Sequence, residues 1–134
     1  PNHLHFYVAA HRKSPFKWGE QDCLLFAAGG VAAITGIDPA AKYRGKYRTE
    51  AGAQKIIEAA GGWSKLIAGC ARAVGMRRIH RTMAWRGDVV MCKLTKNARP
   101  AAGICMGEVG AFPSDEGLVF VPIAECMKTA WRVG

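Results

Sequence analysis

The chain has 134 residues, of which 50% are hydrophobic and 22% charged, a composition that is typical of a folded domain and excludes a disordered or low-complexity chain. This length suits one compact domain, so we expect residues 1–134 to form a single domain. The longest uncharged apolar run, residues 23–37, is shorter than the roughly 20 residues of a membrane-spanning helix, and no membrane span is expected. The formal net charge of +9 favours an acidic partner. Nucleic acid is the least favoured one, because the basic residues form no helix-turn-helix or basic aromatic helix.

The number and spacing of the cysteines indicate that their thiols are reduced. The five of them, Cys23, Cys70, Cys92, Cys105 and Cys126, occur without a Cys-x-x-Cys pair or a repeated spacing. We therefore expect no disulfide framework, no metal and no other cofactor, and synthesis in the cytoplasm. The N-terminus lacks the basic and apolar parts of a signal peptide, so direct export is not indicated. Cys70 falls on an apolar helix face, and Cys92 and Cys105 fall in predicted strands, where burial is the simplest role.

The first half of the chain is predicted to be helical, because its apolar residues recur at spacings of three and four. The first helix ends at Ser14-Pro15, and the second ends at Gly36, which can adopt the left-handed conformation of a helix C-terminus. Thr49 is expected to cap the third helix. The four expected helices cover about residues 2–13, 20–35, 49–61 and 63–75.

The second half changes to the shorter period of strands. A loop at 95–100 joins the first two strands into a hairpin, the strand at 109–112 is weakened by its glycine and the following proline, and 124–127 is a single helical turn. The expected strands cover residues 88–94, 101–107, 109–112, 118–121 and 129–133. The pattern predicts an α+β fold, with N-terminal helices packed on a C-terminal antiparallel sheet and the second helix against that sheet.

Cys23 stands where a nucleophile is expected, in the first turn of the second helix. Unpaired backbone N–H groups and the helix dipole favour a thiolate there. An equally weighted interpretation is that Cys23 is a small packing residue at a crowded helix start. Asp22 is interpreted as the helix N-cap. Trp18 and Gly19 shape the turn into the helix, and Trp18 is also a candidate substrate-stacking residue.

Three segments resemble, in order, motifs of the NlpC/P60 cell-wall peptidases, which belong to the papain-like cysteine peptidase superfamily. Residues 16–23 resemble the family's opening, in which Trp-Gly precedes Asp-Cys, and residues 86–91 resemble its Gly-Asp-Leu-Val strand. Residues 102–107 are similar to its Val-Gly-Ile-Tyr-Leu-Gly strand. The resemblance covers most of the chain and implies a papain-like α+β fold with Cys23 as the candidate nucleophile.

A closer resemblance is to a branch of small tail-associated proteins of phages and prophages. In that branch the Trp-Gly-x-x-Asp-Cys segment occurs together with endings like residues 117–122 and 130–133. The resemblance implies a virion protein of the tail tip or baseplate, made in the host cytoplasm. Its partners would be tail hub and tip proteins, with peptidoglycan as a further one.

The chain departs from the active enzymes at their general base. In those enzymes a histidine opens the strand that corresponds to Ala101 onward, and a polar residue near Phe112 orients it. A general base typically contributes about 10²–10⁴-fold in rate. His80 is the first candidate for a substitute, because neighbouring arginines would keep its imidazole neutral, and His11 is the second. A surface or packing role is the simpler interpretation of both.

The sequence therefore predicts a catalytically degenerate domain of a phage tail tip that acts as a structural or docking subunit. The alternative is an active peptidoglycan endopeptidase, in which Cys23 attacks the amide between D-glutamate and the next residue. A nucleic-acid-binding module is supported by the net charge alone and ranks third.

Overall fold

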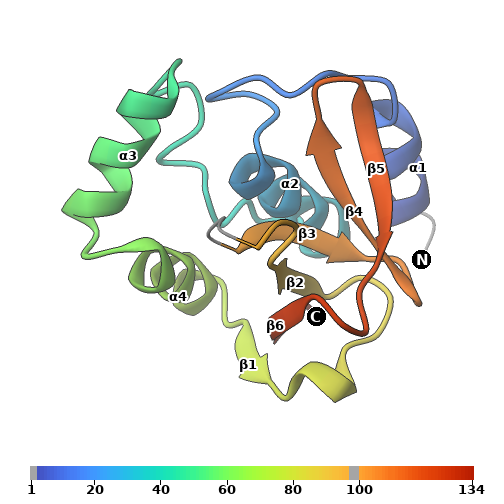
Figure 1. The fold of residues 1–134 in the computed structure, drawn as a ribbon. Helices are drawn as coiled ribbons and strands as arrows, with labels where there is room; N and C mark the ends of the chain where they lie inside the picture. Colours follow the sequence, from blue (N-terminus) through green and yellow to red (C-terminus); the bar gives the residue numbers. More distant parts are fainter. Residues whose placement is uncertain (1–2, 97–99) are drawn as a thin grey trace.

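A computed structural model describes residues 3–96 and 100–134. In these residues four helices precede a six-stranded antiparallel sheet, so the fold is α+β as predicted (Figure 1). The helices are α1 (His3–His11), α2 (Cys23–Thr35), α3 (Glu50–Ala59) and α4 (Trp63–Ala73). The strands are β1 (Arg77–Ile79), β2 (Val89–Cys92), β3 (Ala101–Cys105), β4 (Val109–Ser114), β5 (Gly117–Pro122) and β6 (Met127–Arg132), and a short 3-10 helix, η1 (Arg81–Met83), follows β1. Residue 2 of the first expected helix and residues 97–99 of the expected loop lie outside the described residues.

The sheet has the strand order β1-β6-β2-β3-β4-β5. β2 and β3 form the predicted hairpin, and β4 and β5 form a second one that closes at Ser114 and Gly117. β4 is longer than expected and contains Pro113. The strand tolerates this proline because β3 pairs only with residues 110 and 111 of β4, so Pro113 lies beyond that ladder.

The edge strand β1 was not predicted. It has only three residues, and its two arginines are exposed, so it gives no alternation of apolar and polar residues. It pairs with β6, with Arg77 opposite Arg132. The expected helical turn at 124–127 is a single turn in which the Met127 N–H donates to the Ile123 carbonyl at 3.0 Å, and β6 begins there.

The central helix α2 is buried on nearly every side, because it lies between α1 and the sheet. Two adjacent glycines allow this close packing. A Cβ at Gly30 would lie 2.3 Å from Ile104 Cδ1 of β3, and one at Gly29 would lie 2.2 Å from the hydroxyl of Tyr7. That hydroxyl donates to the Phe26 carbonyl at 2.7 Å and joins α1 to α2. Ile34, which was expected on the buried stripe, is 38% exposed at the end of the helix.

The two faces of the sheet belong to different parts of the core. Val89 and Met91 face the helices, whereas Val90 and Cys92 pack into a second core on the opposite face. The sheet twists strongly, so that β4 and β5 run across the direction of β2 and β3 (Figure 1). The buried Cys70, Cys92 and Cys105 confirm the packing roles expected for them, and burial raises the pKa of all three thiols.

Helices α3 and α4 lie on the side of the molecule away from α1 and the β4–β5 hairpin (Figure 1). They extend the main core around the N-terminal half of α2 through Ala53, Ile57, Leu66 and Ile67. No helix of the described ranges is long and apolar enough to cross a bilayer.

Candidate functional site

A tight turn leads into α2 and delays its start from the expected residue 20 to Cys23. The Gln21 N–H donates to the Lys17 carbonyl at 2.8 Å and closes the turn. Gly19 has a φ of 81°, and a Cβ there would lie 1.9 Å from the Tyr47 carbonyl oxygen. Only glycine fits this position, which agrees with the expected role of Gly19 in shaping the turn.

Asp22 is the N-cap of α2, as predicted, and the residue is buried, with 2% of its surface exposed. It accepts hydrogen bonds from the N–H groups of Leu25 at 2.9 Å and Gly19 at 3.0 Å. The hydroxyl of Tyr47 donates to the same carboxylate. Burial raises the pKa of Tyr47, and the bond to Asp22 and the charge of that carboxylate raise it further. Asp22 is therefore engaged in holding the helix start and the loop before α3 together.

Cys23 begins α2, is partly exposed, and lines a shallow pocket whose empty space of about 330 Å³ includes its open mouth. Trp18 lines the same pocket, so the structure brings two of the predicted site residues together. The remaining wall comes from the loop before α3 and from α3 and α4. The lining residues are Trp18, Asp22, Cys23, Leu24, Tyr47, Ala53, Ile56, Ile57, Trp63 and Leu66. The pocket is therefore apolar and aromatic, with one buried carboxylate that is already hydrogen-bonded.

None of the four histidines of the chain lines this pocket. His80 is exposed, caps η1, and has its Nδ1 2.7 Å from the hydroxyl of Thr82. His11 ends α1, with its ring beside Tyr7 and its Nδ1 2.8 Å from the Tyr7 carbonyl. The two candidate bases thus have local roles in other elements, and the structure does not bring either one into the pocket with Cys23.

The position of the expected histidine can be read from the register of β3. Ala101 pairs with Cys92 and packs with it into the second core, on the face away from α2. Ala102 is the first residue of β3 that faces the helices. Phe112 is fully buried in the second core, where the missing side chains of Gly103 and Gly110 make room for its ring. The side chains of Ala101, Ala102 and Phe112 cannot accept a proton.

Sequence reasoning did not identify three notable residues near Cys23. Tyr47 and Trp63 reach the pocket from segments remote in sequence, and only the tertiary fold brings them there. Gln21 is 7% exposed, and its side-chain Nε2 has no hydrogen-bond partner among the described residues. The available signal for Gln21 was its polar side chain two positions before a candidate nucleophile, whereas its burial is visible only in the structure.

Asp88 has a structural role at the entry to β2. Its buried carboxylate accepts from the N–H groups of Trp85 and Val133, each at 3.1 Å, and forms an ion pair with Arg132 at 3.1 Å. Arg132 in turn lies 3.6 Å over the ring of Trp85. In the part of the chain that the structure describes, no three His, Cys, Asp or Glu side chains are grouped as metal ligands.

Comparison with curated proteins and with solved structures finds no match for this chain in either set. A family model does match, over residues 1–133, and its description is Domain of unknown function (DUF6950). Since this match spans nearly the whole sequence, the chain belongs to the DUF6950 family.

Proposed function

We propose that the chain is an NlpC/P60-like domain that has lost its hydrolytic chemistry and acts as a docking subunit of a phage tail tip or baseplate. The helices-then-sheet order and the cysteine at the start of the helix packed on the sheet support the relationship. The tail context rests on the resemblance of the Trp-Gly-x-x-Asp-Cys segment and of the C-terminal strands.

The proposed loss of hydrolytic activity rests on one observation: no imidazole is among the residues that line the pocket beside Cys23. A helix N-terminus can favour the thiolate that attacks a peptide carbonyl. It cannot protonate the departing amine, and without that proton the tetrahedral adduct returns to reactants by expelling the thiolate. Asp22 cannot easily replace the acid, because three donors already hold its carboxylate.

The same pocket suits docking. Its aromatic and aliphatic wall, with Trp18 and Trp63, offers an apolar surface on which an apolar side chain of a tail hub or envelope component can pack. In this role the wall of the pocket matters, whereas the thiol of Cys23 is dispensable.

The alternative function is a working peptidoglycan endopeptidase, made in the host cytoplasm and carried in the virion tail. The partial exposure of Cys23 at a helix N-terminus favours it. In this case the thiol itself is essential.

Two substitutions at one position separate these functions. Cys23→Ala removes the thiol and leaves the pocket open, whereas Cys23→Arg removes the thiol and fills the pocket with a cation. Docking predicts that virions carrying Cys23→Ala keep their infectivity and that Cys23→Arg reduces it. An endopeptidase required for infection predicts that both variants lose infectivity. Circular dichroism checks that both fold, and mass spectrometry of purified virions tests the tail location.

A further inference from the structure

A cationic hollow lies between α4 and the sheet, separate from the pocket of Cys23. It has a volume of about 950 Å³ including its open mouth, and α4, β1, β2 and β6 all contribute to it. We call it the α4 groove. Trp63 lines both the α4 groove and the Cys23 pocket, so the two are neighbours that share one side chain.

The rim of the α4 groove is positively charged. Lys65 of α4, Arg78 of β1 and Lys128 of β6 line it, and no aspartate or glutamate is among its lining residues. The three ion pairs found within residues 3–96 and 100–134 do not include any of these cations. On the other flank of α4, Lys42 and Arg72 line a second hollow that also contains Lys65. The positive charge therefore continues around α4, and neither hollow has an aspartate or glutamate among its lining residues.

The inner surface of the α4 groove is apolar. Met91 and Ile67 are buried beneath it, and Trp131 and Pro100 form part of its wall. The indole N–H of Trp63 donates to the Pro100 carbonyl at 2.7 Å, which fixes this tryptophan in the wall. The groove thus combines an apolar floor with cations that come from three separate elements.

We propose that the α4 groove binds an acidic peptide segment of a partner protein, with an apolar side chain on the floor and carboxylates at the rim. This inference rests on the docking role proposed above and adds the chemistry of the partner. Charge complementarity supports it, because three cations surround a groove that has no anion of its own. A single-stranded nucleic acid is less suited, since it requires a track of cations along its backbone rather than a cationic ring around an apolar floor.

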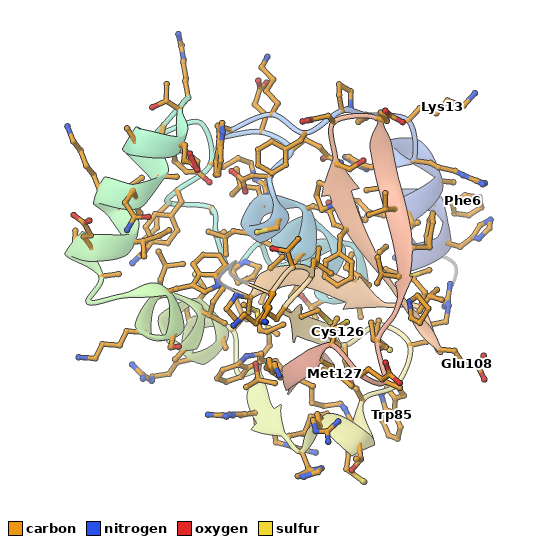
Figure 2. All side chains as sticks on the ribbon, in the orientation of Figure 1. Phe6, Lys13, Trp85, Glu108, Cys126 and Met127 are labelled. Atoms are coloured by element: carbon orange, nitrogen blue, oxygen red, sulfur yellow. The ribbon has the colours of Figure 1, made fainter. Side chains whose placement is uncertain are left out.

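Two strongly exposed aromatic residues elsewhere, Phe6 and Trp85, do not form a competing site together. Phe6 is 65% exposed on α1, and Trp85 is 59% exposed after η1. They project from separate parts of the surface (Figure 2). Trp85 is also covered on one face by Arg132.

The test measures fluorescence anisotropy of a labelled peptide, Glu-Glu-Leu-Phe-Glu-Glu, with the full chain carrying Cys23→Ala. The groove variant is the double substitution Lys65→Glu and Lys128→Glu. The matched control is Lys13→Glu and Lys55→Glu, which changes the net charge equally at exposed residues outside the groove. Lys13 projects near the β4–β5 hairpin (Figure 2). Thermal unfolding checks that both variants fold.

The expected result is saturable binding that the groove variant weakens by about tenfold or more and that the control leaves within about twofold. A peptide with glutamine in place of each glutamate should bind at least about tenfold more weakly. Equal weakening by both variants would assign the binding to net charge and overturn the proposal, as would no binding at all. Tighter binding of an oligo-dT strand through the same lysines would overturn it in favour of nucleic acid.

The outcome is separable from that of the proposed function. Absence of peptide binding together with infectious Cys23→Ala virions would overturn the α4 groove alone. Peptide binding with non-infectious Cys23→Ala virions would overturn the docking role of the Cys23 pocket while leaving the groove as a partner site.

Discussion

The hydroxyl of Tyr47 donates a hydrogen bond to the buried carboxylate of Asp22, the residue that caps α2 and precedes Cys23. This bond ties the loop before α3 to the start of the central helix. The turn at Gly19 fits under the Tyr47 backbone at the same point. The position of Cys23 thus depends on contacts between segments about 25 residues apart in the chain.

Tyr47→Phe should lower the free energy of unfolding by about 2 kcal/mol, because it removes a buried hydrogen bond to a charged acceptor. Tyr43→Phe is the matched control, since Tyr43 is half-buried and is not part of the Asp22 network. Its effect should stay within about 0.5 kcal/mol. Urea unfolding measures both, and an equal loss in the two variants would contradict the role given to the Asp22 bond.

Gly19→Ala should destabilise the chain far more than Gly36→Ala. Both glycines have a φ near +80°, so alanine at either site is expected to lose about 1–2 kcal/mol through backbone strain. At Gly36 no atom lies within 4 Å of the added Cβ, whereas at Gly19 the Tyr47 carbonyl oxygen would lie at 1.9 Å. We expect Gly19→Ala to lower the free energy of unfolding by at least about 3 kcal/mol, because it strains the backbone and displaces the loop that carries Tyr47. Similar melting temperatures for the two variants would show that the turn adjusts freely.

Stability should fall at alkaline pH, and Tyr7 and Tyr47 should contribute to this fall beside the three buried cysteines, whose pKa values are also raised. Burial is the main cause that raises the pKa of both phenols above their ordinary value of 10.0. In the unfolded chain these phenols ionise near that value, but in the folded protein they stay protonated. The unfolded state is therefore favoured as the pH rises above about 10, by up to ~1.4 kcal/mol per pH unit for each phenol. Tyr7→Phe should reduce this slope, which urea unfolding measures between about pH 9.5 and 11.5, a range around the ordinary phenol pKa. An unchanged slope would contradict the role given to Tyr7.

Alkylation should distinguish the cysteines by burial. Cys23 and Cys126 are partly exposed, whereas Cys70, Cys92 and Cys105 are buried with raised pKa values, so that few of their thiols ionise near neutral pH. Iodoacetamide should modify the first two before the other three in the native protein, as followed by peptide mass spectrometry. Early modification of Cys92 would contradict its burial in the second core. As a control, denaturant should expose all five thiols equally.

Signals that act over a few residues predicted most of the fold. Asp22 and Thr49 cap helices, and Gly36 ends one, because each effect depends only on the adjacent turn. β1 could not be predicted, since three residues with exposed arginines carry no strand pattern and become a strand only by pairing with β6. Pro113 argued for a short β4, but the extent of a ladder depends on where the neighbouring strand ends.

The candidate site was predictable only in part. Cys23 and Trp18 lie close together in the sequence, at the turn before α2, and both line the same pocket. Tyr47 and Trp63 join them through tertiary packing, which no spacing in the sequence encodes. The alignment of Ala101 with the expected histidine illustrates the same limit, because a shift of one residue in a strand exchanges the faces, and Ala102 is the residue that faces the helices.

The most direct test of the central claim is the rate of cleavage of a defined muropeptide between D-glutamate and the next residue, compared between the unmodified chain and Cys23→Ala. Because the pocket of Cys23 contains no imidazole, we predict that both proteins give the same background rate. A rate for the unmodified chain that is well above background and is abolished by Cys23→Ala would contradict this account and establish the chain as a peptidase.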